Sequence, residues 1–436
     1  MRILRKFAVL FAVLALVAAA CGSSSDETTT TVAAGGDETT TTAASKSDPA
    51  ELTLWHTFNE AETPTLDGMI SACEAETGHT VNVELVPFGE AQNKFKTAAQ
   101  AGEAPDIMRA EIAWIAEFAD LNYLAPITGM VSAEDAADYL EAPSAYGKYA
   151  GQLWAVPQAT DAPAVYYNVA LLEANGIEVP TTMDELKAAG EAFNAATGTP
   201  GIGTIKGGYW TQIFVWAFGG ELMNDDGSEI LINSPEAVAG LDFYVSMQTD
   251  GAIQAELDFT NEYGNVQEAF KAGEIAFNIN GPWQSADLLG GDAFVDDPSN
   301  LGIFPAPPGP GGQGSPVGGH SWTVSADAMD AGIDVAAYEV ISCLNSTDAQ
   351  VTWAVNNNIL PTRASAYEAA EVKSNAVISA FGEAMKVAHA RPVIPAGGAI
   401  YTAFDANVQA AFQGTMTGQE AMDNIATAWT ELGLGS

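Results

Sequence analysis

Basic residues are scarce in this sequence. Its 436 residues include 15 Lys and Arg against 56 Asp and Glu, which gives a formal net charge of −41. Nucleic acids and anionic membrane surfaces are bound through basic patches, so this balance argues against both as direct partners. It also disfavours an anionic substrate. The excess acidity is explained most simply by a well-solvated surface.

Cysteines, histidines and short catalytic motifs are also few. The three cysteines form no Cys-x-x-Cys pair, and the four histidines (His56, His79, His320 and His389) lack the spacing of a metal site. The sequence contains no Walker A loop, no Gly-x-Ser-x-Gly and no His-Glu-x-x-His. We therefore predict no metal and no cofactor. Many enzymes lack such motifs, so their absence is weak evidence against catalysis.

The longest apolar run lies at the N-terminus. Arg2, Arg5 and Lys6 precede an apolar stretch over residues 7–20. This stretch is shorter than a membrane span of about 20 residues. It ends at Cys21 in a pattern that resembles a bacterial lipobox, although Ala18 stands where Leu is usual. We predict a lipoprotein signal peptide over residues 1–20 and lipidation of Cys21. The alternative is an ordinary secretory signal with an incidental cysteine.

The stretch that follows is predicted to be a disordered tether. Residues 21–50 are dominated by Ser, Thr, Ala, Gly and Asp and cannot bury a core. A lipid anchor and a tether ahead of a globular body suit an exported protein held at the outer face of the cell membrane. The lipid would then be its only contact with the membrane.

The globular body begins with a β-α-β-α-β pattern, which predicts an α/β fold with a parallel sheet and right-handed crossovers. The expected elements are a strand over 52–55, a helix over 63–77 with Leu66, Met69, Ile70 and Cys73 on one face, a strand over 81–85, a helix ending near 102 and a strand over 106–108. Ligands bind beyond the carboxyl ends of parallel strands. Asn59 and Glu60 follow the first strand, and Arg109 and Glu111 follow the third.

A second informative stretch is 270–283. An alternating run through Ile275, Phe277 and Ile279 ends at Gly281-Pro282 and delivers Trp283. A large ring at a strand end either stacks on the apolar face of a sugar or completes a core. The Pro- and Gly-rich stretch 292–319 is expected to be mostly loop, followed by a strand over 322–325.

Several segments together resemble the extracellular solute-binding proteins of sugar ABC importers. They are VPFGEAQNKFKTAAQAGEAPDIMRAEIAWIAEFADLNYLAPI, YAGQLWAVPQATDAPAVYYNVALL, EAFKAGEIAFNINGPW, PVGGHSW, LPTRASAY and ARPVIPAGGAIYTAF. Within that family the chain is most similar to the maltose- and maltodextrin-binding lipoproteins of actinobacteria. The resemblance covers about residues 51–432.

The resemblance implies a two-lobed periplasmic-binding-protein-like fold with a ligand cleft between lobes. The chain would cross the hinge more than once, with residues 51–160 plus 321–362 in lobe one and 161–320 plus 363–436 in lobe two. It also implies a non-catalytic monomer that hands an oligosaccharide to the permease subunits of an ABC importer.

The family's ligand positions imply a set of site residues in this chain. They are Asn59, Glu60, Arg109, Glu111, Asp161, Tyr209, Trp283, Gly318, Gly319, His320, Tyr401 and Asp405. Two departures stand out. Asp405 occupies a position where better-known maltose binders have a basic residue, and Gly207-Gly208 replaces an acidic residue shortly before the aromatic. The first departure concerns the second or third sugar subsite, and the second suggests a shorter ligand or different hydroxyl contacts.

Other functions compete with capture of maltodextrin. The ligand could be another oligosaccharide, such as trehalose, sucrose or a cyclodextrin. A secreted glycosidase would need a carboxylate pair, for which Glu111 and Asp161 are the candidates. A surface adhesin is a third class. The resemblance over the whole body favours a binding protein.

Cys73 and Cys343 are expected on helices of the same lobe. An exported protein meets an oxidising compartment, where the two could form a disulfide. Cys73 also fits as an apolar core residue on its helix face, and we favour that role.

Overall fold

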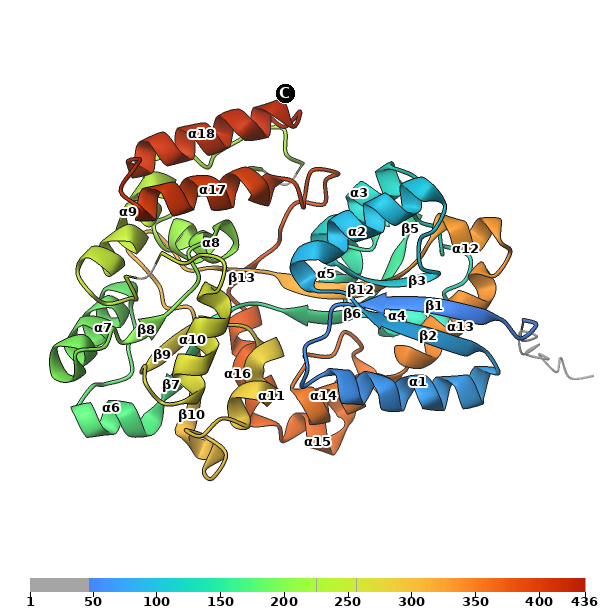
Figure 1. Cartoon of the computed structure of the whole chain (residues 1–436), viewed down its shortest axis with the longest axis horizontal. Coiled ribbons are helices and arrows are strands. Elements are labelled where there is room, and N and C mark those ends of the chain that lie inside the picture. The colour runs from blue at the N-terminus through green and yellow to red at the C-terminus, as the bar shows by residue number, and fades with distance from the viewer. Residues whose placement is uncertain (1–46, 225, 256, 436) are drawn as a thin grey trace, which may run out of the picture. The chain divides into compact units, whose positions relative to one another are not determined.

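The computed structural model describes residues 47–224, 226–255 and 257–435. The predicted signal peptide, Cys21 and most of the predicted tether therefore lie outside the described residues. Within the described ranges, no helix combines the length and the apolar character needed to cross a membrane. The body is built on two β-sheets, each with its own helices (Figure 1).

The first sheet has five strands. Their order across the sheet is β2 (Thr80–Leu85), β1 (Glu51–His56), β3 (Ile107–Glu111), β12 (Gly318–Val324) and β6 (Ala155–Asp161). β1 pairs in parallel with β2 and β3, which confirms the predicted parallel arrangement. β12 runs antiparallel to β3 and β6. We call this sheet and its helices lobe one.

The first sheet has an apolar layer on each face, because successive side chains along β1 point to opposite faces. Leu54 faces a core that includes Leu66 of α1, while the other face packs against Phe95 and Phe118. The helices around this sheet are α1 (Thr63–Thr77), α2 (Phe88–Ala101), α3 (Ile115–Asp120), α4 (Ala133–Asp138), α5 (Glu141–Ala145), α12 (Ala326–Asp330), α13 (Asp334–Leu344) and α14 (Thr347–Asn357), with the 3-10 segment η1 (Ile112–Trp114) and the hairpin β4 (Lys148–Tyr149) and β5 (Gln152–Leu153).

The second sheet has four strands, in the order β10 (Leu301–Pro305), β7 (Ala164–Asn168), β9 (Phe277–Asn280) and β8 (Ile202–Gly203). Around it lie α6 (Val169–Asn175), α7 (Met183–Thr197), α8 (Gly208–Ala217), α9 (Pro235–Thr249), α10 (Glu262–Lys271), η2 (Pro282–Gln284), α11 (Ser285–Leu289), η3 (Pro298–Asn300), η4 (Ser365–Glu368), α15 (Ala370–Lys373), α16 (Ala376–Met385), α17 (Ile400–Phe412) and α18 (Gly418–Glu431). We call this assembly lobe two.

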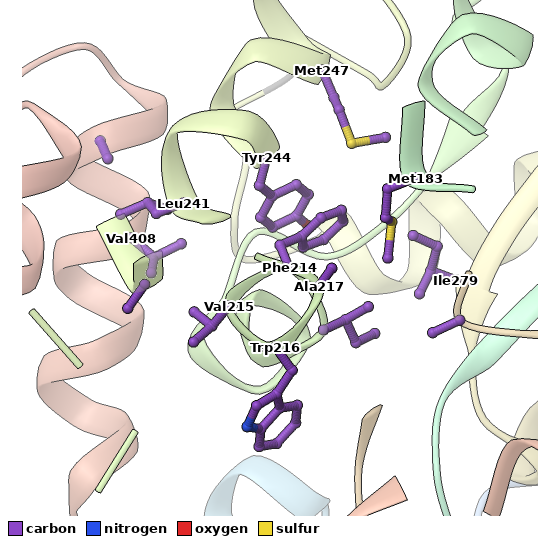
Figure 2. Packing of buried hydrophobic residues seen from close by; sticks show 14 of the residues in the cluster. Met183, Phe214, Val215, Trp216, Ala217, Leu241, Tyr244, Met247, Ile279 and Val408 are labelled. Carbon is purple, nitrogen blue, oxygen red and sulfur yellow. The ribbon is translucent and has the colours of Figure 1, made fainter. Parts of the chain in front are cut away.

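The largest core of lobe two surrounds α8. Phe214 stacks on Tyr244 of α9 with ring centroids 3.9 Å apart, and Met183, Met247 and Ile279 surround that pair (Figure 2). α17 packs against α8 and runs side by side with α18, which also packs against α9 (Figure 1). The packing therefore holds α8, which carries Tyr209, against α17, which carries Tyr401.

Three expectations about strands need correction. β3 extends to Glu111, so Arg109 and Glu111 lie on the strand and not after it, because β12 pairs with it along that length. β12 begins at Gly318, four residues earlier than expected. The stretch 292–319 contains β10, whose ladder partner is the distant β7. In each case a partner far away in sequence supplies the pairing.

Cys73 and Cys343 form a disulfide that joins α1 to α13 across a sequence separation of 270 residues. Our preference for Cys73 as a core residue without this bond was therefore wrong. The two roles are compatible, because Cys73 is also buried in the core of lobe one. A small apolar sulfur on a helix face fits a core in either redox state, so the periodicity could not separate them.

Candidate functional site

The turn after β1 places Asn59 and Glu62 at the start of α1. Asn59 Oδ1 accepts from the Glu62 amide at 3.0 Å, and Glu62 Oε2 accepts from the Asn59 amide at 2.9 Å. This reciprocal pair has the form of a capping box. It leaves Glu62 Oε1 buried with no hydrogen-bond partner among the described residues. Glu60 is exposed, so Glu62 and not Glu60 is the buried carboxylate of this turn.

Arg109 lies on β3 and is buried. Its Nε donates to Gln158 Oε1 at 2.8 Å, its Nη1 donates to Thr57 Oγ1 at 3.1 Å, and the guanidinium lies 3.8 Å from the centroid of the Phe58 ring. Thr57 Oγ1 is also 3.3 Å from His320 Nε2. Because the Thr57 oxygen accepts from Arg109, its proton is free to go to the His320 nitrogen. This relay suits a neutral His320 ring.

Asp161 ends β6, opposite Gly318 of β12. Its Oδ1 is buried and unpartnered among the described residues. A Cβ at Gly318 would collide with this oxygen and would lie 2.7 Å from the Tyr209 hydroxyl. Glycine at 318 therefore makes room for a carboxylate of lobe one and a tyrosine of lobe two to approach the same space. The neighbouring Gly319 has φ +138, a backbone conformation that favours glycine.

Glu111 is already occupied. Its Oε2 accepts from the Ala113 amide at 2.8 Å and caps η1, and its Oε1 forms an ion pair with Arg391. Arg391 lies between α16 and α17, also donates from Nε to the Val317 carbonyl at 2.7 Å, and is buried. Glu111 is thus held by this ion pair and its capping bond.

Three aromatic residues from lobe two belong to the same region. The Tyr209 and Tyr401 ring centroids are 6.4 Å apart, and the Arg391 guanidinium lies 5.5 Å from the first and 6.0 Å from the second. Trp283 follows β9 and folds its ring over Gly281. Its indole N–H donates to Tyr263 OH at 2.8 Å, and its carbonyl accepts from Asn59 Nδ2 at 3.0 Å. That last bond joins the two lobes directly.

Asp405 has a local partner. Its Oδ1 accepts from the Gly208 amide at 2.7 Å, at the first residue of α8. A carboxylate at a helix N-terminus is a favourable arrangement. The two departures noted in the sequence are therefore linked in space, because the acid at 405 packs against the glycine pair at 207 and 208.

Burial perturbs most of the ionisable groups in this region. It raises the pKa of Asp161 to about 7 and raises the pKa of Glu62 above its usual range. It also lowers the pKa of Arg109 to about 10, although the charges of Glu62 and Asp161 act in the opposite direction. Burial holds the pKa of His320 well below its usual value, with the positive charges of Arg109 and Arg391 adding to the effect. Three carboxylates thus share the region with two guanidinium groups.

A surface hollow elsewhere in lobe one contains none of these residues. It is lined by Trp55 of β1 and by residues of α2, including Lys94 and Asn93. The Lys94 ammonium lies 4.1 Å from the centroid of the Trp55 ring and covers its face. Among the described residues, we found no group of His, Cys, Asp and Glu arranged to hold a metal ion.

Residues 59–351, more than half of the chain, match the family described as bacterial extracellular solute-binding proteins. The chain belongs to this family. Among solved structures, it is similar to the GacH receptor of Streptomyces glaucescens, with a TM-score of 0.83 and 33% identity over 88% of this chain and 99% of that one. GacH has been solved unliganded and in complex with acarbose.

Two further proteins share this similarity. Maltose-bound MalE3 of T. maritima has a TM-score of 0.80 and 25% identity over 88% of this chain and 100% of that one. A maltotriose-binding protein of Pyrococcus abyssi is 25% identical over 361 residues, covering 80% of this chain and 75% of that protein. The two-lobed α/β fold inferred from the sequence is confirmed. These proteins bind substrates and are not enzymes, which argues against the glycosidase alternative for this solute-binding protein.

Sequence analysis missed Glu62 and Arg391. Glu62 lies two positions after Glu60, which was selected. The Asn-x-x-Glu spacing from Asn59 to Glu62 was the signal that could have identified it. Arg391 is 280 residues from its partner Glu111, so no local pattern connects them. A usable signal was the rarity of arginine. Beyond Arg2 and Arg5, the sequence contains only Arg109, Arg363 and Arg391.

Proposed function

We propose that this solute-binding protein captures an oligosaccharide of the maltose and maltodextrin class between its two lobes. The observation that carries the proposal is the pair of buried, unpartnered carboxylate oxygens, Glu62 Oε1 and Asp161 Oδ1. They share the region with Arg109, whose guanidinium has more donors than its two hydrogen bonds use. Buried acceptors without donors are costly, and ligand hydroxyl groups would supply those donors.

The aromatic residues fit the other half of a sugar's chemistry. A pyranose has an apolar C–H face as well as its hydroxyl groups, and tyrosine and tryptophan rings cover such faces. Tyr209, Tyr401 and Trp283 come from lobe two, whereas Glu62, Arg109 and Asp161 come from lobe one. A sugar between the lobes would therefore meet rings on one side and charged groups on the other.

The named ligands of related proteins support the same class. GacH has been solved with acarbose, MalE3 with maltose, and the Pyrococcus protein is named for maltotriose. Another oligosaccharide, such as trehalose, sucrose or a cyclodextrin, is the second candidate. The observation that favours it is the use of Asp405 to cap α8, which changes the polar groups near Tyr209.

The remaining parts of the proposal concern delivery. The chain would be exported and anchored at the cell membrane through a lipid on Cys21, and it would act as a monomer that docks on the permease subunits of an ABC importer. The lobes would be residues 51–160 plus 321–362 and 161–320 plus 363–436. The sheet of lobe one extends slightly past these limits, because β6 ends at Asp161 and β12 begins at Gly318, so we assign Asp161 and Gly318 to lobe one.

Calorimetry on the soluble body with maltose, maltotriose, trehalose, sucrose and a cyclodextrin tests the proposed ligand class. We expect a maltooligosaccharide to bind most tightly and to be recovered unchanged. Binding of trehalose or sucrose alone would favour the second candidate, and absence of binding to all five would contradict sugar capture. Replacing Cys21 with Ser tests the anchor, because the variant should appear in the medium and not in the membrane fraction.

A further inference from the structure

A short segment between α16 and α17, residues 388–398, connects the two lobes without being one of the proposed chain crossings. We call it the strap. At its start, β13 (Ala388–His389) pairs with β11 (Ser315–Pro316), and the Val317 amide donates to the His389 carbonyl at 2.9 Å. The strap is therefore joined to the stretch that leads directly into β12 of lobe one.

Further along, the strap is attached to lobe one by a backbone bond, an ion pair and apolar contacts. The Arg391 amide donates to Tyr146 OH at 2.8 Å, and the Arg391 side chain pairs with Glu111. Ile112, Tyr146 and Val317 form a small apolar cluster against which Met385, Ala388 and Val393 pack. Near its end, a Cβ at Gly397 would lie 2.8 Å from the Ala113 carbonyl oxygen, so the backbone passes close to η1.

Arg391 also reaches the aromatic residues Tyr209 and Tyr401 of lobe two. Its Nη1 donates to the Tyr401 hydroxyl at 3.4 Å, and that oxygen also accepts from Gln212 Nε2 at 3.1 Å. The guanidinium lies within 6.0 Å of both tyrosine ring centroids. One side chain thus contacts a carboxylate of lobe one, the backbone before β12 and a ring of lobe two.

Separating Arg391 from Glu111 would leave a buried charge without its partner, which is costly. The strap should therefore stay docked on lobe one, through Arg391 and the apolar cluster, when the lobes move. The strap is also fixed to lobe two, because His389 stacks on Trp216 of α8 and Ile394 belongs to the core around α8. The position of Tyr401 relative to lobe one would then depend on how firmly Arg391 is held.

We propose that Arg391 is a positioning residue that sets the Tyr209–Tyr401 pair in register with lobe one, so that these rings meet a ligand held by the lobe-one carboxylates. The inference rests on the proposed sugar-binding function. It assigns Arg391 a task separate from ligand contact, because its guanidinium already bonds to groups of both lobes through Glu111, Val317 and Tyr401. All three arginines of the described body are buried, and Arg363 provides a matched comparison.

Arg363 resembles Arg391 in burial and chemistry but lies elsewhere. It pairs with Asp135 at 2.7 Å and with Asp138 at 3.2 Å, and it lies 4.3 Å from the centroid of the Tyr139 ring. A lysine at either position keeps the charge and loses the planar fork. Loss of a buried ion pair in general would affect both variants, whereas a positioning effect would appear only at 391.

The experiment compares Arg391→Met, Arg391→Lys, Tyr146→Phe and Arg363→Lys with the wild type, using calorimetry with maltotriose and small-angle scattering with and without it. We expect Arg391→Met to weaken binding by about tenfold or more, because the Tyr209–Tyr401 pair would no longer be held in register with lobe one. Arg391→Lys should recover part of the affinity and part of the ligand-induced change in radius of gyration. Arg363→Lys should bind as the wild type does.

Folded Arg391→Met protein with wild-type affinity and wild-type compaction would overturn the inference, as would an equal loss in Arg363→Lys. If Arg391→Met does not fold, Tyr146→Phe decides, because it removes only the acceptor of the strap amide and should still weaken binding measurably. If the wild type binds no sugar, the proposed function fails on its own. Hydrogen exchange in ligand-free Arg391→Lys then decides, since unchanged protection over 388–402 would overturn the inference.

Discussion

The ring of Trp283 is half-buried, and its backbone carbonyl has a separate role as a hydrogen-bond acceptor. Replacing it with Ala should weaken sugar binding by about 2 kcal/mol or more, the magnitude of a buried aromatic anchor. The carbonyl that accepts from Asn59 is kept in the variant, so the loss reports on the ring. Calorimetry measures the effect, and Trp283→Phe should lose less. Unchanged affinity in a folded Trp283→Ala protein would remove Trp283 from the site.

Asp161 is predicted to make stability depend on pH. Burial raises its pKa from 3.8 to about 7, so the folded state holds this proton more tightly than the unfolded chain. Its contribution to the free energy of unfolding is therefore fully present below about pH 4 and is lost as the pH rises to about 7. Asp161→Asn removes this dependence.

The comparison needs only the difference between the two proteins, because the other carboxylates titrate in both. Relative to Asp161→Asn, the wild type should lose up to about 3 kcal/mol of unfolding free energy between about pH 5 and about pH 8, at about 1.4 kcal/mol per pKa unit. Urea unfolding at the two pH values measures it. If the difference in unfolding free energy between the two proteins were the same at both pH values, Asp161 would be ionised in the folded protein at both pH values.

The disulfide between α1 and α13 closes a loop of 270 residues. Constraint of the unfolded chain by so long a loop contributes about 5–6 kcal/mol in the loop-entropy description. We expect a reductant to lower the thermal midpoint of the wild type and to leave the Cys73→Ala/Cys343→Ala protein unchanged. Alkylation of both thiols in native, non-reduced protein would contradict the bond itself.

Local sequence patterns predicted the elements whose cause is local. The apolar positions Leu66, Met69, Ile70 and Cys73 form the buried face of α1. With 3.6 residues per turn, positions spaced three or four apart fall on one side of a helix. A capping box between Thr417 and Glu420 opens α18, and the Thr-x-x-Glu spacing shows it in the sequence because its bonds need only four consecutive residues.

Elements that depend on a distant partner were predicted less well. Five residues within a Gly- and Pro-rich stretch become β10 because β7 offers an antiparallel edge, and β3 is lengthened by pairing with β12. The site shows the same limit. Arg109 was selected from its place after the third predicted strand and from the family resemblance, and Asp161 from the resemblance alone. The Glu111–Arg391 pair depends on a strap position that no local periodicity indicates.

Two of the three arginines among the described residues lie in the candidate site. Arg109 and Arg391 are buried among Glu62, Glu111 and Asp161, in a chain whose formal net charge is −41. Buried guanidinium groups without carboxylates would be costly, and so would buried carboxylates without cations. The nearly balanced set leaves the region only weakly charged, which suits a neutral ligand such as a sugar better than an ionic one.

Movement of the two lobes is the last prediction. The bond from Asn59 Nδ2 to the Trp283 carbonyl spans the lobes, and the groups proposed to bind ligand lie on both. A sugar can satisfy both sets only when the lobes approach, and exclusion of water then strengthens each hydrogen bond. Ligand should therefore shift the population toward the closed state by its differential affinity for that state.

Small-angle scattering should show a smaller radius of gyration with saturating sugar. In Asn59→Ala, which lacks the spanning bond, more of the ligand-free protein should be in the expanded form. Identical scattering curves with and without a sugar whose binding calorimetry has verified would mean that capture proceeds without closure, and that the proposed permease would have to recognise occupancy by something other than shape.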